Sequence, residues 1–213
     1  MNTLNPTALH NIGYGLYVLT AREGDKDNGC IINVCQQVTD TPLQIMITVN
    51  KQNYTHDMIL RTGRFNVSLL TEHTPFEVFK HFGFQSGRDV NKFEGIEVEM
   101  RSANGILYIP RYTNAYISGQ MKRATDLGTH TLFIAEVTEA VQLSNDPSLT
   151  YAFYHKHIKP QPAAPAPSGS TGTTRWVCQT CGYVYEGDEV PDDFVCPWCK
   201  HGKADFVKVE ENQ

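Results

Sequence analysis

The sequence predicts a mainly β protein in two parts, a large antiparallel β domain and a small metal-binding domain, and three observations predict it. Period-two stretches of β-branched and aromatic residues recur along the first part of the chain. Residues 159–174, KPQPAAPAPSGSTGTT, have almost nothing to bury, which is typical of a linker. Beyond that stretch lie two C-x-x-C motifs. We therefore predict domains at 1–158 and 175–213, joined by a linker at 159–174.

Length and composition limit the classes of function. With 213 residues, 40% of them hydrophobic and 19% charged, the chain can bury one good core and that of a small satellite domain. The net charge of −5, without clusters of Lys or Arg, argues against nucleic-acid binding. No stretch approaches the roughly 20 apolar residues of a membrane helix, and the first residues lack a signal-peptide pattern. We expect a soluble cytoplasmic protein whose six cysteines are thiols or metal ligands rather than disulfides.

The elements of the large domain can be assigned in order from their periodicity. Helical pattern is confined to residues 54–62, which end at Gly63, to 75–82, where Pro75 suits a helix start and Gly83 its end, and to 149–157. Six or more strands with so few helices suggest a closed barrel. The chain has neither a Rossmann fingerprint nor a Walker-type phosphate loop. The predicted strands are 14–21, 30–39, 43–50, 64–70, 96–101, 114–122 and 131–143.

Four of the six cysteines form a metal-binding pattern. Two C-x-x-C motifs with fourteen residues between them can bring four thiolates around one tetrahedral ion. Zinc and iron both accept four thiolates, and the spacing alone favours a structural zinc ribbon. The predicted ligands are Cys178, Cys181, Cys196 and Cys199.

The surroundings of these cysteines favour iron. Six aromatic residues in this short segment would form a compact apolar jacket around the thiolates, and low dielectric is one of the levers that tune a redox potential. The segment WVCQTCGYVYEG…PDDFVCPWCKHGKADF resembles the rubredoxin family, in the shortened form found as a tail on larger redox proteins. That resemblance implies one iron ion that carries one electron. The aromatic residues are Trp176, Tyr183, Tyr185, Phe194, Trp198 and Phe206.

The tail is also acidic. From residue 175 to the end it holds four Lys or Arg against eight Asp or Glu, a formal charge of −4 that leaves −1 on the rest of the chain. An acidic electron carrier can be steered to a basic patch on a partner, and plain solubility accounts for the charge equally well.

A one-electron metal site cannot accept a hydride, so the large domain is expected to hold a cofactor that splits electron pairs, as flavin does. Residues 50–57, NKQNYTHD, place Lys51, Asn53 and Thr55 near a helix N-terminus, which is a natural phosphate site. The alternative is that Asn53 only caps the helix and that Lys51 is solvated. The segments NGCIIN and CQQVT, at residues 28–33 and 35–39, offer small and amide-bearing side chains to a polar ring edge.

These segments, together with FQSGRDVNKF at 84–93 and LGTHTLF at 127–133, resemble the flavin reductase-like, FMN-binding split-barrel family over residues 4–157. The resemblance implies FMN as cofactor, NADH or NADPH as donor, and a homodimer with FMN at its interface. It also implies His130 near the nicotinamide, where this chain has Thr129 in place of an Asp found in many relatives. The residues implied to bind FMN are Asn28, Cys30, Asn33, Thr39, Lys51, Asn53, Thr55, Ser86, Arg88 and Lys92.

The remaining histidines and cysteines are expected to be structural. Four thiolates already complete a tetrahedral shell, so the other histidines suit surface or capping positions. Cys30 and Cys35 differ by an odd number of residues, so on one regular strand they would face opposite sides of the sheet and could not pair.

Both domains in this order resemble the high-molecular-weight rubredoxins, a family of fusions that in anaerobes passes electrons from NADH to an A-type flavoprotein that reduces oxygen or nitric oxide. The resemblance implies an NAD(P)H-dependent oxidoreductase that sends electrons through FMN and the four-cysteine iron to such a partner. Two alternatives stay open: a flavin or ferric reductase with an ancillary rubredoxin tail, and a non-enzymatic FMN-binding module with a structural zinc ribbon.

Overall fold

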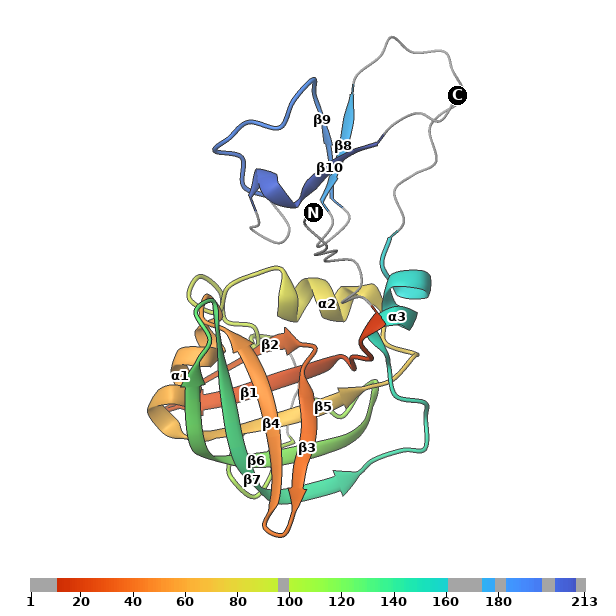
Figure 1. Cartoon of the computed structure of the whole chain (residues 1–213). Coiled ribbons are helices and arrows are strands. Elements are labelled where there is room, and N and C mark those ends of the chain that lie inside the picture. The colour runs from red at the N-terminus through yellow and green to blue at the C-terminus, as the bar shows by residue number, and fades with distance from the viewer. Residues whose placement is uncertain (1–10, 96–99, 161–173, 179–182, 197–201, 210–213) are drawn as a thin grey trace, which may run out of the picture.

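The computed structural model describes residues 11–95, 100–160, 174–178, 183–196 and 202–209. The strands of its large sheet are β1 (Tyr17–Glu23), β2 (Lys26–Ile32), β3 (Cys35–Asp40), β4 (Leu43–Asn50), β5 (Arg64–Leu70), β6 (Thr113–Asp126) and β7 (His130–Gln142). They form one curved antiparallel sheet in the order β2-β1-β5-β6-β7-β4-β3 (Figure 1). This confirms the predicted mainly β fold of the large domain.

The chain crosses from one edge of the sheet to the other at Asn33 and Val34. The prediction of one strand over 30–39 is wrong, because these two residues separate β2 from β3, and the two strands are the opposite edges of the sheet. Asn favours such a turn, since its side chain competes with the strand for backbone hydrogen bonds. The edges meet near this crossing, where the Tyr17 hydroxyl donates to the carbonyl oxygen of Cys35 at 3.3 Å. The sheet is therefore a barrel that is split between β2 and β3.

Two apolar clusters hold the barrel together. The inner cluster fills the barrel and includes the completely buried Leu19, Phe65 and Phe133. The outer cluster packs Val18 and Phe82, among others, between the outside of the sheet and the helices that cover it. Neighbouring residues of β1 thus face different clusters, as the alternation of side chains along a strand requires.

Helix α1 (Tyr54–Thr62) packs against β1 and β2 and agrees with the prediction at both ends. Met58 and Ile59 enter the inner cluster, whereas Leu60 is 46% exposed. The helix ends at Gly63, whose φ of 69° is a left-handed conformation that suits glycine. The N–H of Gly63 donates to the carbonyl of Ile59 at 2.8 Å and so closes the last turn.

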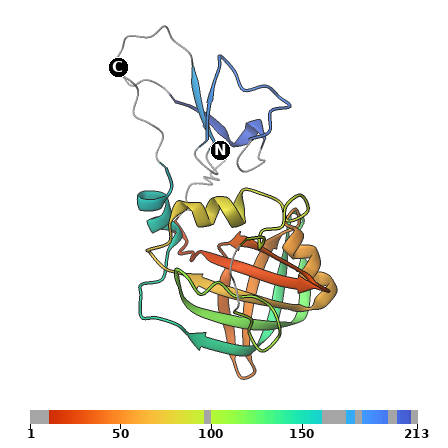
Figure 2. The same cartoon turned by 180° about the vertical axis from the view of Figure 1, so that it is seen from behind.

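The other helices cover the outside of the barrel. Helix α2 (Phe76–Gly83) begins after Pro75, as predicted, and lies on the side of the barrel that faces the small domain (Figures 1 and 2). The helix predicted at 149–157 forms as a short turn, α3 (Tyr151–Phe153), continued by the π-helical turn η2 (Tyr154–Ile158). The predicted strand at 96–101 lies mostly outside the described residues, and Arg101 forms an isolated bridge with Leu107.

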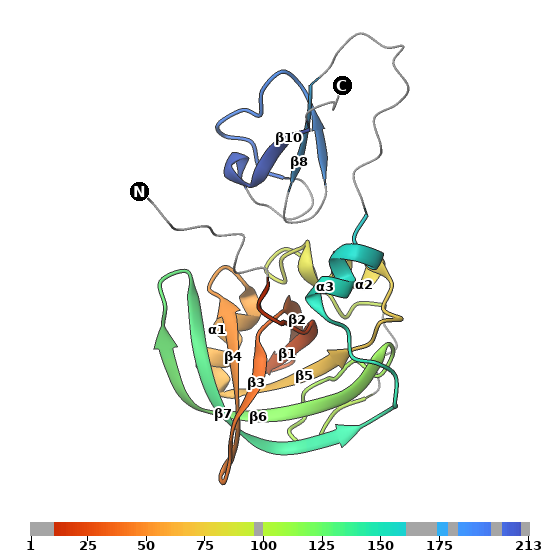
Figure 3. The same ribbon diagram turned by 45° about the vertical axis from the view of Figure 1, so that its right-hand side comes forward.

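The small domain is an antiparallel sheet in the order β10-β8-β9 with a short 3-10 turn, η3. It lies beyond α2 and α3 in every view (Figures 1 to 3). The predicted linker falls largely outside the described residues. The elements are β8 (Arg175–Cys178), β9 (Val184–Glu186), η3 (Lys203–Asp205) and β10 (Phe206–Val209).

Candidate flavin and metal sites

Three of the predicted site residues lie together where β4 meets α1. Lys51 follows β4, and its Nζ is 2.5 Å from the Oδ1 of Asp126 at the end of β6. His130 begins β7 and is paired in the sheet with the residue before Lys51. Asn53 is the N-cap residue of α1, yet its side chain makes no capping hydrogen bond. Asn53 therefore occupies the N-cap through its backbone only, and Lys51 is partly exposed and paired with Asp126. A phosphate at this helix end would meet the positive end of the helix dipole with the Lys51 ammonium group nearby.

Thr39 lies far from this group. It pairs with Gln44 beside the β3–β4 turn, and its hydroxyl donates to the carbonyl of Pro42 at 2.5 Å. Gln44 and Lys51 lie seven positions apart, which is about 23 Å along an extended strand. Asn33 lies at the crossing between β2 and β3, nearer to the Lys51 end. The structure thus spreads the predicted residues along the β3–β4 hairpin instead of gathering them.

Three further predicted flavin residues are buried inside the barrel. Asn28 and Cys30 on β2 are each 2% exposed, and Thr55 on α1 is 0% exposed. The Asn28 Nδ2 donates to the Thr55 Oγ1 at 2.9 Å. Burial raises the pKa of the Cys30 thiol, while a hydrogen bond with Thr55 opposes that shift. In this structure these side chains join β2 to α1, and a direct contact with a flavin stays a prediction.

Cys30 and Cys35 form no disulfide, as predicted, but the predicted reason, opposite sides of one regular strand, is wrong. They lie on different strands, β2 and β3, and both pack against the inner cluster rather than facing opposite sides of one strand. Burial raises the pKa of the Cys35 thiol to about 12. At neutral pH this thiol is therefore protonated and a poor nucleophile.

A chain of hydrogen bonds links β7, α1 and the loop at 84–93. His56 is 4% exposed and bonds the Thr131 Oγ1 at 2.8 Å through Nε2 and the Asp57 Oδ1 at 2.9 Å through Nδ1. Asp57 then accepts a bond from Arg88 Nη2 at 2.6 Å. Burial by itself would raise the pKa of Asp57, but the bonds from Arg88 and His56 lower it overall.

The expectation of a surface or capping role is wrong for His56. Its place on the helix carried a signal, because a residue three positions before Ile59 shares the buried face of α1. Its partner Asp57 is adjacent in the sequence, whereas Thr131 on β7 comes within reach only through the tertiary fold.

The loop at 84–93 divides its three predicted residues between the surface and the interior. Ser86 is half-buried, and its Oγ accepts a bond from the N–H of Arg88, whose side chain is exposed. Lys92, by contrast, is 3% exposed. Its Nζ donates to the carbonyls of Gly29 at 2.9 Å and Phe82 at 2.8 Å, and burial lowers its pKa. Lys92 thus ties the loop to β2 and to the end of α2.

Two of the four predicted metal ligands lie at the core of the small domain. Cys178 and Cys196 are both 0% exposed and share one cluster with Val190 and Phe206. Cys181, Cys199 and the predicted aromatic Trp198 lie outside the described residues. The predicted aromatic jacket is present in the other five residues, Trp176, Tyr183, Tyr185, Phe194 and Phe206.

This arrangement fits a four-thiolate ion. The two buried cysteines are the first residues of the two C-x-x-C motifs; Cys178 ends β8, and Cys196 lies beyond β9. A buried thiolate needs a cation, since an isolated charge in an apolar cluster is costly. The aromatic neighbours would limit water around such an ion.

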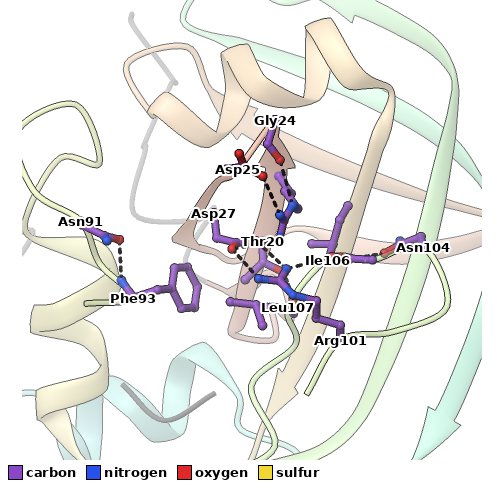
Figure 4. Close-up of polar contacts among 12 residues, drawn as sticks. Thr20, Gly24, Asp25, Asp27, Asn91, Phe93, Arg101, Asn104, Ile106 and Leu107 are labelled. Carbon is purple, nitrogen blue, oxygen red and sulfur yellow. Dashed lines mark hydrogen bonds and ion pairs between the residues drawn. The ribbon is translucent and has the colours of Figure 1, made fainter. Parts of the chain in front are cut away.

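Two surface pockets lie apart from these sites, beside β1 and β2. One of about 430 Å³ and one of about 550 Å³ share Arg101 in their walls, and neither is lined by a predicted flavin residue. The guanidinium of Arg101 meets Asp27 at 2.7 and 2.9 Å (Figure 4). Arg22 adds a longer contact with Asp27 at 3.5 Å. Because neither pocket is lined by a predicted flavin residue, we place the candidate flavin site at the β4–α1 junction.

The fold and these sites agree with comparisons to known proteins. Residues 9–160 match the family model described as flavin reductase like domain. The chain belongs to the flavin reductase-like family. Residues 176–207 match a second model, the rubredoxin-like domain of rubrerythrin. The predicted order of a flavin reductase-like barrel and a rubredoxin-like tail is confirmed.

Individual relatives repeat this organisation in whole or in part. A high molecular weight rubredoxin from Moorella thermoacetica is 34% identical over 97% of this chain and 100% of its own length, which confirms the predicted resemblance. A ferric-chelate reductase (NAD(P)H) from Archaeoglobus fulgidus is 36% identical over 70% of this chain and 87% of its own. The solved NADH:FAD oxidoreductase SgcE6 of Streptomyces globisporus has the same fold, with a TM-score of 0.60 and 20% identity over 70% of this chain and 92% of that one.

Within the part of the chain that the structure describes, none of the helices has the length and apolar character needed to cross a bilayer.

Proposed function

We propose that this protein takes electrons from NADH or NADPH, passes them through FMN in the barrel to one iron ion, and delivers them to an A-type flavoprotein that reduces oxygen or nitric oxide. The enzyme class, an NAD(P)H-dependent flavin oxidoreductase, is that of the family to which the barrel belongs. The observation that carries the proposal is the burial of Cys178 and Cys196 in a rubredoxin-like domain on the same chain as that barrel.

The residues present fit the two cofactors. Lys51 and the N-terminus of α1 would hold the phosphate of FMN, and Ser86 and Arg88 are accessible beside the helix. Bound flavin would supply the acceptance of a hydride and the release of its electrons one at a time. Four cysteine thiolates, two of them buried in the described core, would hold the iron.

The proposed electron flow balances. One NAD(P)H gives up a hydride, which carries two electrons, and two ferric ions are each reduced to ferrous by one of them. One proton is released per NAD(P)H oxidised. Because each chain holds one four-cysteine site, the iron must pass its first electron onward, or to a second chain, before it takes the next.

A visible spectrum tests the metal and the relay. We expect purified protein to be red, with thiolate-to-iron bands beside those of flavin, and NADH to bleach both under anaerobic conditions. Replacing Cys178 by Ser removes the iron bands and leaves the reduction of flavin by NADH intact. Unchanged electron delivery to the flavoprotein partner in this variant would refute the relay, and a colourless metal would favour zinc.

A second function is favoured by the 36% sequence identity between this chain, over 70% of its length, and a ferric-chelate reductase. In that case the barrel would reduce ferric chelates or free flavin directly, and the tail would be ancillary. Turnover of NADH with free FMN or a ferric chelate, compared with turnover with a flavoprotein partner, separates the two. We also propose a homodimer with FMN at its interface. Equilibrium sedimentation with and without FMN measures the mass in solution and so tests this proposal.

A further inference from the structure

Phe84 is the point at which the barrel meets the metal domain. This half-buried side chain follows α2, and it packs against the cluster formed by Cys178, Val190, Cys196 and Phe206. One residue of the barrel therefore packs against a cluster that includes two of the predicted iron ligands. A contact of this kind places the metal domain over the end of α2, where the views show it (Figures 1 and 3).

The barrel holds Phe84 in a fixed position. Its N–H donates to the carbonyl of Lys80 at 3.2 Å and closes the end of α2. Its ring lies edge-on to the ring of Phe76 with centroids 5.8 Å apart. Two residues earlier, the carbonyl of Phe82 accepts a bond from the buried Lys92 at 2.8 Å. Phe84 is thus presented by a helix end that is anchored on both sides.

The same position lies close to the predicted flavin residues. Ser86 follows Phe84 by two residues and Arg88 by four, and a chain spans at most about 3.6 Å per residue. The Cα of Ser86 is therefore within about 7 Å of that of Phe84, and the Cα of Arg88 within about 14 Å. Phe84 thus contacts the cysteine cluster and lies, along the chain, within a few residues of two predicted flavin residues.

We propose that Phe84 is a positioning residue that docks the metal domain on the barrel and thereby sets the rate of electron transfer from flavin to iron. This inference rests on the proposed function. Electron transfer slows steeply with distance, so a tether that only confines the domain, at an effective concentration of about millimolar, leaves most arrangements unproductive. An apolar contact through Phe84 selects the arrangement in which the cysteine cluster lies against the loop at 84–93.

The apolar nature of this contact separates it from electrostatic docking. The tail has a formal charge of −4, so a docking held by charge would weaken with salt. Contact through Phe84 predicts that transfer within one molecule is insensitive to salt.

The experiment uses the full chain with FMN and iron bound. Phe84→Ala removes the ring and Phe84→Leu keeps an apolar side chain. Leu60→Ala, an equally simple truncation at a 46% exposed position of α1, is the matched control. Small-angle X-ray scattering reports whether the domains stay together, and stopped-flow mixing with NADH reports flavin reduction and loss of the iron bands separately.

We expect Phe84→Ala to enlarge the radius of gyration and to slow the bleaching of iron about tenfold, the factor that corresponds to about 1.4 kcal/mol of lost docking. Flavin reduction and the iron–thiolate spectrum stay unchanged. For Phe84→Leu, we expect a radius of gyration and a rate of iron bleaching between those of wild type and Phe84→Ala. For Leu60→Ala, we expect both quantities to equal those of wild type.

The outcomes separate this inference from the proposed function. Wild-type scattering and a wild-type transfer rate in Phe84→Ala overturn the inference, as does a transfer rate in the wild type that falls with salt. Enlarged dimensions with an unchanged rate overturn the role in transfer. If iron in the wild type is never reduced by NADH while Phe84→Ala still expands, the proposed function fails and the docking contact stands.

Discussion

Replacing Lys92 by Met separates two roles for a residue that the sequence assigns to flavin binding. The structure buries the side chain to 3% exposure and gives its Nζ two acceptors, the carbonyls of Gly29 and Phe82. Met has a similar length and fills the same space without a donor. The substitution therefore removes both hydrogen bonds and leaves two carbonyls inside the protein without this partner.

The magnitude follows from those two bonds. A hydrogen bond from a charged donor contributes about 1.5–3 kcal/mol, so the pair contributes about 3–6 kcal/mol. Burial of the thioether returns about 1 kcal/mol, and removing a buried charge returns part of its desolvation cost. We expect the Lys92→Met barrel to lose about 3 kcal/mol of its free energy of unfolding at pH 7.

The pH dependence of that difference has a definite sign. In the folded protein, burial lowers the pKa of Lys92 below its ordinary value of 10.5. A smaller electrostatic effect of Cys30 raises the pKa and opposes this shift. Below the folded pKa the amine is protonated in both states and contributes no slope. Between the folded pKa and 10.5 the unfolded chain binds the extra proton, so the wild type gains stability relative to Lys92→Met as pH rises through that window.

Urea unfolding of the flavin-free protein, followed by far-UV circular dichroism, measures the barrel. Both tryptophans of the chain lie beyond the linker, so their fluorescence reports the small domain separately and the two transitions need not be treated as one. Lys80→Met is the control, because Lys80 is exposed on α2 and makes one surface ion pair with Glu77 at 3.3 Å. A Lys92→Met barrel as stable as the Lys80→Met control, with weaker FMN binding, would refute this reasoning and support the flavin role.

Two further predictions concern the contacts around the same loop. A Cβ at Gly87 would lie 2.0 Å from the Oδ1 of the buried Asn28, so Gly87→Ala should lower the free energy of unfolding in urea by about 1–3 kcal/mol. In the control Gly13→Ala the new Cβ meets nothing within 4 Å, so the free energy of unfolding should change little. Equal effects of the two substitutions would contradict the packing argument. Asp57 has a folded pKa below its ordinary value of 3.8, so its contribution is present above that pH and is lost as pH falls through the folded pKa. Asp57→Asn should therefore be about 1 kcal/mol less stable than wild type at pH 7, and the difference should shrink as the pH falls below 3.8 towards the folded pKa of Asp57. A difference that does not shrink in acid would count against the ion pair with Arg88.

Local pattern predicted most of the barrel because each strand carries its own alternation. β4 and β5 have the predicted bounds, and α1 ends at Gly63 as the left-handed C-cap requires. The crossing at Asn33 was beyond local pattern, since residues on both sides of it favour strands and only the sheet order shows that they belong to opposite edges. The predicted strand at 96–101 cannot be compared, because most of it lies outside the described residues.

The site was predicted less completely, because sequence motifs do not reveal which polar residues are buried. Motif and spacing selected Lys51 and His130 separately, and only the pairing of β4 with β7 shows that they are neighbours. The same reasoning assigned Asn28 and Thr55 to the binding of flavin. In the structure these two side chains are hydrogen-bonded to each other, from the Asn28 Nδ2 to the Thr55 Oγ1 at 2.9 Å. For Cys178 and Cys196 the structure shows the shared burial that two C-x-x-C motifs around one ion would require, and their binding of a metal stays a prediction.

The loop at 84–93 connects these separate observations. Its first residue, Phe84, packs against the core of the small domain, Gly87 lies against Asn28 of β2, and Arg88 pairs with Asp57 of α1. Lys92 then returns inside and fixes the loop to the end of α2. A segment with anchors on the barrel and on the small domain cannot shift at one without straining the other. Ser86 and Arg88, which are predicted to bind flavin, therefore share one anchored segment with Phe84, so we expect flavin binding and the docking of the small domain to influence each other.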